Sequence, residues 1–99
     1  MAAFQLTTRA KEDLKSIGLY TKREWGVRQR NIYLNEIDHT FKMLSQQPEL
    51  GIACSYIRKG YYKFPINSHV IFYKLLVKNK LIIVRILHKN MDINTQLFR

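Results

Sequence analysis

The residues best suited to acid–base chemistry lie between positions 69 and 88. A ribonuclease that works without a metal needs a general base, a general acid and cations that stabilise the charge of the phosphorane. Histidine, tyrosine and arginine side chains that meet on one sheet face would supply these groups. The catalytic candidates under this hypothesis are His69, Tyr73, Arg85 and His88.

The same residues have a structural interpretation, which we favour. A histidine near a strand end often satisfies a backbone group, and Arg85 can pair with an acidic side chain. Lys74 interrupts the same apolar sequence and can protect an edge strand from unwanted pairing. A catalytic role would require a mutual geometry that spacing along the chain does not establish.

Other catalytic and metal-binding patterns are missing from the sequence. The three histidines and one cysteine form no His-x-x-x-His or Cys-x-x-Cys spacing, so we expect no metal and no cofactor. The chain has no P-loop, no G-x-G-x-x-G and no G-x-S-x-G. The lone Cys54 is expected to be a passive small residue, and it favours a reducing compartment.

Charge and length define the broad class of the protein. The 99 residues include 17 Lys and Arg against 7 Asp and Glu, a formal net charge of +10. Such a field attracts nucleic acid or an acidic protein surface, although a basic surface that only aids solubility is the alternative. We expect one domain over residues 1–99, without a signal peptide or membrane span, in the cytoplasm.

The first half of the chain has helical periodicity after a short strand at residues 4–7. A threonine at 7–8 is expected to cap the first helix, with Glu12 and Asp13 in its first turn. Gly26 is expected to end that helix, because glycine readily takes the left-handed conformation. The apolar face consists of Ala10, Leu14, Ile17 and Thr21.

A second helix is expected at about residues 27–47, antiparallel to the first because the connection is very short. Trp25, at that connection, is expected to be a core residue or an anchor of the hairpin. The apolar stripe of the second helix consists of Tyr33, Ile37, Phe41 and Leu44.

The second half has strand-like sequence. Residues 61–64 predict a strand that Pro65 ends, and 69–77 and 81–88 predict a hairpin around a turn at 78–80. The fold class is therefore α+β, with the helical hairpin packed on an antiparallel sheet. Simple alternation places Leu81, Ile83, Arg85 and Leu87 on one face and Ile82, Val84, Ile86 and His88 on the other.

An ordered series of short motifs runs over almost the whole chain. It resembles the RelE/ParE superfamily of bacterial toxins, and within it the ParE branch, whose fold is a helical hairpin on an antiparallel sheet. The motifs are Leu6-Thr7, Ala10-x-x-Asp13-Leu14-x-x-Ile17, Tyr20-Thr21-x-x-x-Trp25-Gly26, Gln29, Tyr33, Phe41-x-x-Leu44-x-x-x-Pro48-x-x-Gly51, Ile57-Arg58-x-Gly60-Tyr61, Phe64, His69-Val70-Ile71-Phe72-Tyr73 and Arg85-Ile86-Leu87-His88-x-x-Met91-Asp92.

The resemblance implies a toxin that poisons DNA gyrase by binding, without catalysis, and that meets DNA only through gyrase or its antitoxin. It also implies a ParD-like antitoxin, whose acidic segment would fold around the toxin. The target contacts expected on this basis are Lys63, Lys74, Arg85, His88, Lys89, Met91 and Asp92. The antitoxin contacts expected on this basis are Arg58, Tyr61, Tyr62, Lys74 and Arg85.

The sister RelE branch is similar in fold but cuts messenger RNA on the ribosome, so an endoribonuclease is the alternative. The strand from His69 to Tyr73 is apolar where that branch tends to place a catalytic arginine, which argues against this activity. One position also departs from ParE: Tyr62 follows Gly60-Tyr61, where the family often has arginine.

Overall fold

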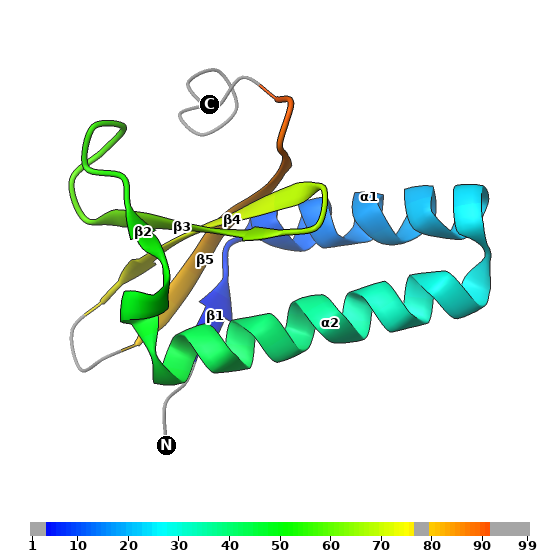
Figure 1. Cartoon of the computed structure of the whole chain (residues 1–99), viewed down its shortest axis with the longest axis horizontal. Coiled ribbons are helices and arrows are strands. Elements are labelled where there is room, and N and C mark those ends of the chain that lie inside the picture. The colour runs from blue at the N-terminus through cyan, green and yellow to red at the C-terminus, as the bar shows by residue number, and fades with distance from the viewer. Residues whose placement is uncertain (1–3, 77–79, 92–99) are drawn as a thin grey trace.

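The structure is a computed structural model that describes residues 4–76 and 80–91. Within these residues a short strand, two long helices and a sheet follow one another (Figure 1). The elements in order are β1 (Phe4–Leu6), α1 (Thr8–Trp25), α2 (Val27–Gln46), a 3-10 helix (Pro48–Leu50), β2 (Ile52–Ala53), β3 (Tyr61–Ile66), β4 (His69–Leu75) and β5 (Leu81–His88). The predicted α+β class is confirmed.

The strands form one sheet in the order β1-β5-β4-β3-β2. The sheet is mixed, whereas the sequence predicted an antiparallel one. The edge strand β1 runs parallel to β5, with Phe4 opposite Leu81, and the other neighbours are antiparallel. The direction of β1 depends on a partner at the other end of the chain, so no local pattern encodes it.

The helix boundaries follow the predicted signals, with one correction. Thr7 caps α1, since its side chain accepts a 3.1 Å hydrogen bond from the Ala10 N–H. Glu12 and Asp13 lie beyond the first turn, which contains no acidic residue, because α1 begins at Thr8. Gly26 ends the helix with a φ of 92°.

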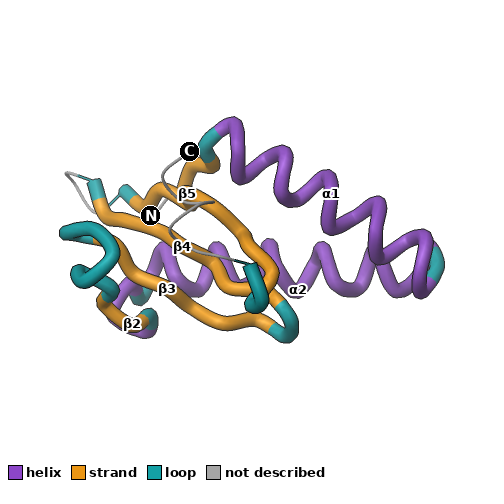
Figure 2. The backbone as a smooth tube through the Cα atoms, turned by 90° about the horizontal axis from the view of Figure 1, so that it is seen from above, coloured by secondary structure: helices purple, strands orange, loops and turns teal. Residues whose placement is uncertain are grey.

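The helices bury their predicted stripes against the sheet. The helix-side core contains Ala10, Ile17, Tyr33, Ile37, Phe41, Leu44, Ile71, Tyr73, Leu81, Ile83 and Ile86. Trp25 is not part of it: 72% of its surface is exposed, so the prediction of a core residue is wrong. Figures 1 and 2 give the reason, because the connected end of the hairpin extends past the sheet.

The strands differ from the predicted pattern at two places. β3 continues through Pro65 to Ile66, and Pro65 is tolerated because β2 pairs with β3 only at Tyr62 and Lys63. A register shift lets Phe72 pair with Arg85 and Tyr73 with Ile83. The predicted turn at 78–80 lies mostly outside the described residues, as does Val77.

The register shift leaves Val84 as an extra residue and changes which side chains face the helices. Ile83 and Ile86 both lie in the helix-side core, although strict alternation would separate them. A second core lies on the opposite face of the sheet. It contains Cys54, Tyr61, Phe72 and Leu87, and the predicted passive role of Cys54 agrees with its complete burial.

Candidate functional site

Two histidines lie side by side at one end of the sheet. His69 on β4 pairs in register with His88 on β5, and their rings meet edge to face at 5.6 Å between centroids. Nδ1 of His69 lies 2.7 Å from the hydroxyl of Tyr33 on α2. Burial lowers the pKa of His69, and the neighbouring His88 lowers it further.

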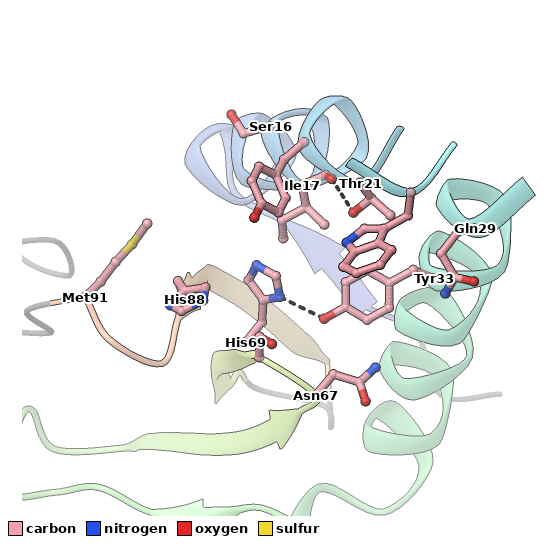
Figure 3. Close-up of a pocket in the computed structure, with 12 residues that line it drawn as sticks. Ser16, Ile17, Thr21, Gln29, Tyr33, Asn67, His69, His88 and Met91 are labelled. Atoms are coloured by element: carbon pink, nitrogen blue, oxygen red, sulfur yellow. Dashed lines mark hydrogen bonds between the residues drawn. The ribbon is translucent and has the colours of Figure 1, made fainter. Parts of the chain in front are cut away.

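The histidines form part of the wall of a pocket between the two helices and the β3–β4 turn (Figure 3). Its volume is about 760 Å³. The lining residues are Ser16, Ile17, Tyr20, Thr21, Trp25, Gln29, Tyr33, Asn67, Ser68, His69, His88 and Met91. No local sequence pattern indicates this pocket, because its residues come from four separate segments.

Tyr73 does not join the two histidines. Its side chain is completely buried, and its hydroxyl donates a 2.6 Å hydrogen bond to the Pro48 carbonyl. Burial raises the pKa of Tyr73 to about 12, which keeps the phenol protonated at neutral pH. This position does not support the predicted catalytic role of Tyr73.

Arg85 is engaged by an acidic side chain. Its Nε and Nη2 donate to the two carboxylate oxygens of Asp13 on α1, at 2.8 and 2.9 Å. Only 12% of the Arg85 side chain is exposed, and the bonds to Asp13 raise its pKa. The predicted pairing with an acidic residue is confirmed, and the four nuclease candidates do not converge on one site.

A cationic patch lies on the sheet face opposite the helices. We define this lysine face by Lys63 on β3 and Lys74 on β4, which flank Tyr61. Lys74 lies opposite Tyr61 in the register, with Nζ 5.7 Å from the centre of the ring. Lys63 donates a 3.0 Å hydrogen bond to the hydroxyl of Tyr56 in the loop before β3. Both lysines are half-buried, so their stems pack while their charges remain accessible.

The predicted contact residues thus divide between two surfaces. Lys63 and Lys74 lie on the lysine face, while His88 and Met91 line the pocket. Arg58 and Lys89 are exposed in loops, whereas Tyr61 is buried and Tyr62 half-buried. Tyr62 stacks on Tyr73 at 5.6 Å, so it belongs to the helix-side core. Asp92 lies outside the described residues.

The described residues contain neither a candidate metal cluster nor a helix suited to span a membrane. No group of three or more His, Cys, Asp or Glu side chains is placed there to hold a metal ion. Neither helix in that part of the chain combines the length and apolarity needed to cross a bilayer.

Comparison with known proteins shows to which protein family the chain belongs. Residues 4–93 match the model of the ParE toxin of type II toxin-antitoxin systems, parDE. The chain belongs to the ParE toxin family. It is 35% identical over 97 residues to toxin ParE1 of Caulobacter vibrioides, covering 98% of this chain and 99% of the relative. It is also 35% identical over 94 residues to toxin ParE1 of Mycobacterium tuberculosis, covering 95% and 96% of the two chains.

Solved structures support the same fold. A chromosomal ParDE system from P. aeruginosa matches with a TM-score of 0.73 at 18% identity, covering 89% of this ParE-family chain and 95% of the other. The toxin-antitoxin complex RelBE2 from Mycobacterium tuberculosis matches with a TM-score of 0.63 at 18% identity, covering 89% and 98%. The predicted resemblance to the ParE branch is confirmed.

Proposed function

We propose that this ParE-family toxin poisons DNA gyrase by binding to it in the cytoplasm, without chemistry of its own. The observation that carries the proposal is the separation of the four nuclease candidates: Tyr73 is buried and Arg85 is bound to Asp13. Arg85 is the permanent cation among the four candidates, and its pairing with Asp13 takes up the charge that would stabilise a phosphodiester transition state. Full-length similarity to ParE toxins supports the same conclusion.

The lysine face is the target surface under this proposal. Lys63 and Lys74 present charge on a sheet face away from the helices, and the net charge of +10 would speed encounter with an acidic protein surface. The further target contacts are His88, Lys89 and Met91 at the other end of β5, together with Asp92. The lysine face meets DNA through gyrase and not by itself under this proposal.

The decisive experiment is a gyrase assay without ribosomes. Purified toxin is expected to block supercoiling of relaxed plasmid and to increase the amount of cleaved DNA. Lys63→Glu combined with Lys74→Glu should weaken inhibition by about tenfold or more, because like charges would then face the acidic target. Lys11→Glu on the exposed surface of α1 is the matched control and should inhibit as well as the unchanged toxin.

Two results would contradict the proposal. Normal supercoiling at saturating toxin would remove gyrase as the target. Cutting of translated messages within the ribosome, with gyrase unaffected, would support the endoribonuclease alternative. This alternative is tested because the fold is similar to that of RelBE2.

We also propose a ParD-like antitoxin whose acidic, partly disordered segment folds on the toxin. Both structural neighbours are toxin-antitoxin systems, which supports a partner of this kind. Among the expected contacts, Arg58 and Lys74 are the accessible cations. Tyr61, Tyr62 and Arg85 would contribute mainly by holding the surface in shape, because they are buried or half-buried.

The antitoxin proposal is tested by calorimetry with a ParD-like acidic protein. Arg58→Glu and Lys74→Glu should each weaken binding, while Lys11→Glu should not. Equal affinities for all three variants would contradict the assignment. Loss of gyrase inhibition on adding the partner would show neutralisation directly.

A further inference from the structure

The proposed function uses the pocket between the helices and the β3–β4 turn only at His88 and Met91, and it assigns no role to the rest of the lining. Three aromatic rings line it, those of Tyr20, Trp25 and Tyr33. Tyr20 and Trp25 are 53% and 72% exposed, which is unusual for such large rings. Exposed aromatic faces that flank a pocket can stack on a flat ligand.

The two histidines give the pocket one acceptor and one donor. Tyr33 donates its single hydroxyl proton to the Ile66 carbonyl at 3.1 Å, so its 2.7 Å contact with His69 requires a proton on Nδ1 of His69. Nε2 of neutral His69 is then an acceptor. Figure 3 shows this second nitrogen of His69 pointing away from Tyr33, toward α1.

His88 has the opposite tautomer. The backbone N–H of Asn90 donates to its Nδ1 at 3.2 Å, so neutral His88 has its proton on Nε2. The rings of His69 and His88 are 5.6 Å apart. Together they offer the acceptor and donor that the edge of a nucleobase needs.

The charge near the pocket suits a phosphate. Arg23 is not a lining residue, but its guanidinium carbon lies 5.5 Å from the centre of the Tyr20 ring, which lines the pocket. Lys22 precedes it on α1, and the whole chain has a net charge of +10. A neutral aromatic ligand would gain nothing from this charge, whereas a nucleotide would.

We propose that this pocket binds a nucleobase carrying a phosphate, either a free nucleotide or an unpaired nucleic-acid strand. The base stacks on Tyr20 and Trp25, its edge meets His69 and His88, and its phosphate faces Arg23. The volume of about 760 Å³ falls within the range of small-ligand pockets, about 300–1,000 Å³. The site shares His88 and Met91 with the expected gyrase contacts, whereas the lysine face is not part of it.

Trp25 is the only tryptophan in the chain, so its fluorescence reports on the pocket directly. Adenosine monophosphate and a twelve-residue oligothymidylate are titrated separately into the full toxin, without gyrase. Saturable quenching by either probe is expected. If the affinity for the oligothymidylate falls steeply with salt and the nucleotide binds weakly or not at all, the natural ligand is an unpaired strand. The reverse order identifies a free nucleotide.

Two tyrosine variants make the test specific. Tyr20→Ala should weaken binding by about fivefold or more, which is the low end of base–aromatic stacking. Tyr56→Ala is the matched control, because Tyr56 is 74% exposed and contacts Lys63 at the lysine face, and it should bind within about twofold of the unchanged toxin.

Ring-proton NMR signals provide a readout that does not depend on tryptophan. The probes should shift His69 and His88 and leave exposed His39 on α2 unchanged. Absence of quenching and of these shifts would overturn the proposal, as would equal losses in both tyrosine variants. So would shifts produced only by an acidic antitoxin peptide. Gyrase inhibition is measured separately and does not depend on any of these outcomes.

Discussion

Asp13 and Arg85 lie 72 residues apart in the sequence and form a bidentate ion pair, with oxygen–nitrogen distances of 2.8 and 2.9 Å. Asp13 also accepts a 2.9 Å hydrogen bond from the backbone N–H of Ile86. β1 pairs with β5 only as far as Ile83, and the Ile86 N–H lies beyond that point. The Asp13 carboxylate therefore supplies the acceptor at this edge of the sheet, where β1 has already ended. One carboxylate thereby joins α1 to the sheet.

We expect Asp13→Ala to lower the free energy of unfolding by about 2–4 kcal/mol, somewhat less than the loss of a fully buried ion-pair partner. The change removes the carboxylate from a guanidinium that is only 12% exposed, and it also removes the acceptor for Ile86. Urea unfolding measures the loss. Asp38→Ala is the control, because the Asp38–Lys42 pair is exposed and should contribute less than about 1 kcal/mol. Equal losses in the two variants would contradict the role of Asp13.

Phe41→Ala is expected to cost about 3–5 kcal/mol. Phe41 is 2% exposed in the helix-side core, and its ring lies 5.5 Å from that of Phe4. The loss reflects both lost burial and the cavity that remains. Leu19→Ala, at a site that is 61% exposed, should change stability by less than about 1 kcal/mol in the same denaturation experiment. A loss well below 1 kcal/mol at Phe41 would show that the helix stripe is misplaced.

Two glycines should respond in opposite ways to alanine. A methyl group at Gly51 would collide with the hydroxyl and ring of fully buried Tyr73, so Gly51→Ala should cost about 1–3 kcal/mol. At Gly18 the nearest neighbour would be Cδ1 of Leu34 at 3.5 Å, an ordinary contact. Gly18→Ala should therefore stabilise α1 by up to about 1 kcal/mol. Thermal unfolding of both variants checks the contrast, and a stabilised Gly51→Ala would contradict it.

Stability is expected to fall as the pH drops below about 6.5. Burial and His88 lower the pKa of His69 in the folded protein below its ordinary value of 6.5, while Asp13 on α1 opposes the shift. The unfolded chain therefore binds more protons in the range just below pH 6.5, and protonation favours unfolding until the lower folded-state pKa is passed.

The variant His69→Gln tests whether His69 causes this pH dependence. Glutamine does not titrate, and its amide can still donate a hydrogen bond to Tyr33 on α2. Unfolding free energies measured from pH 7.5 to 4.5 should fall less steeply in this variant. His39→Gln, at an exposed position, should keep the slope of the unchanged protein. A slope that persists without His69 would assign the effect to another group.

Much of the fold could be predicted because its signals are local. The helical stripe with Tyr33, Ile37 and Phe41 repeats every three or four residues, and each of these side chains is buried as expected. Capping by Thr7 and termination at Gly26 depend on the backbone of a single turn. The boundaries of β5 agree with its apolar sequence for the same reason.

The candidate site was less predictable. The residue types of His69 and His88 indicated a capacity for acid–base chemistry. No sequence pattern indicated that Tyr33 contacts His69 or that the exposed Trp25 lines the same pocket. The predicted cluster also included Tyr73 and Arg85, which other contacts hold elsewhere. A single register shift was enough to invalidate strict alternation along β5, because one extra residue exchanges the two faces of a strand.

The α+β class, the helical hairpin, the positive charge and the ParE resemblance all follow from the order of residues along the chain. Hydrophobic periodicity and turn chemistry act over a few residues, so a linear pattern is enough to predict them. Three relationships appear only in the folded chain: the parallel pairing of β1, the Asp13–Arg85 ion pair and the contact of Tyr33 with His69. These relationships join residues that are far apart in the chain, and their geometry is set by the packing of both helices on the completed sheet.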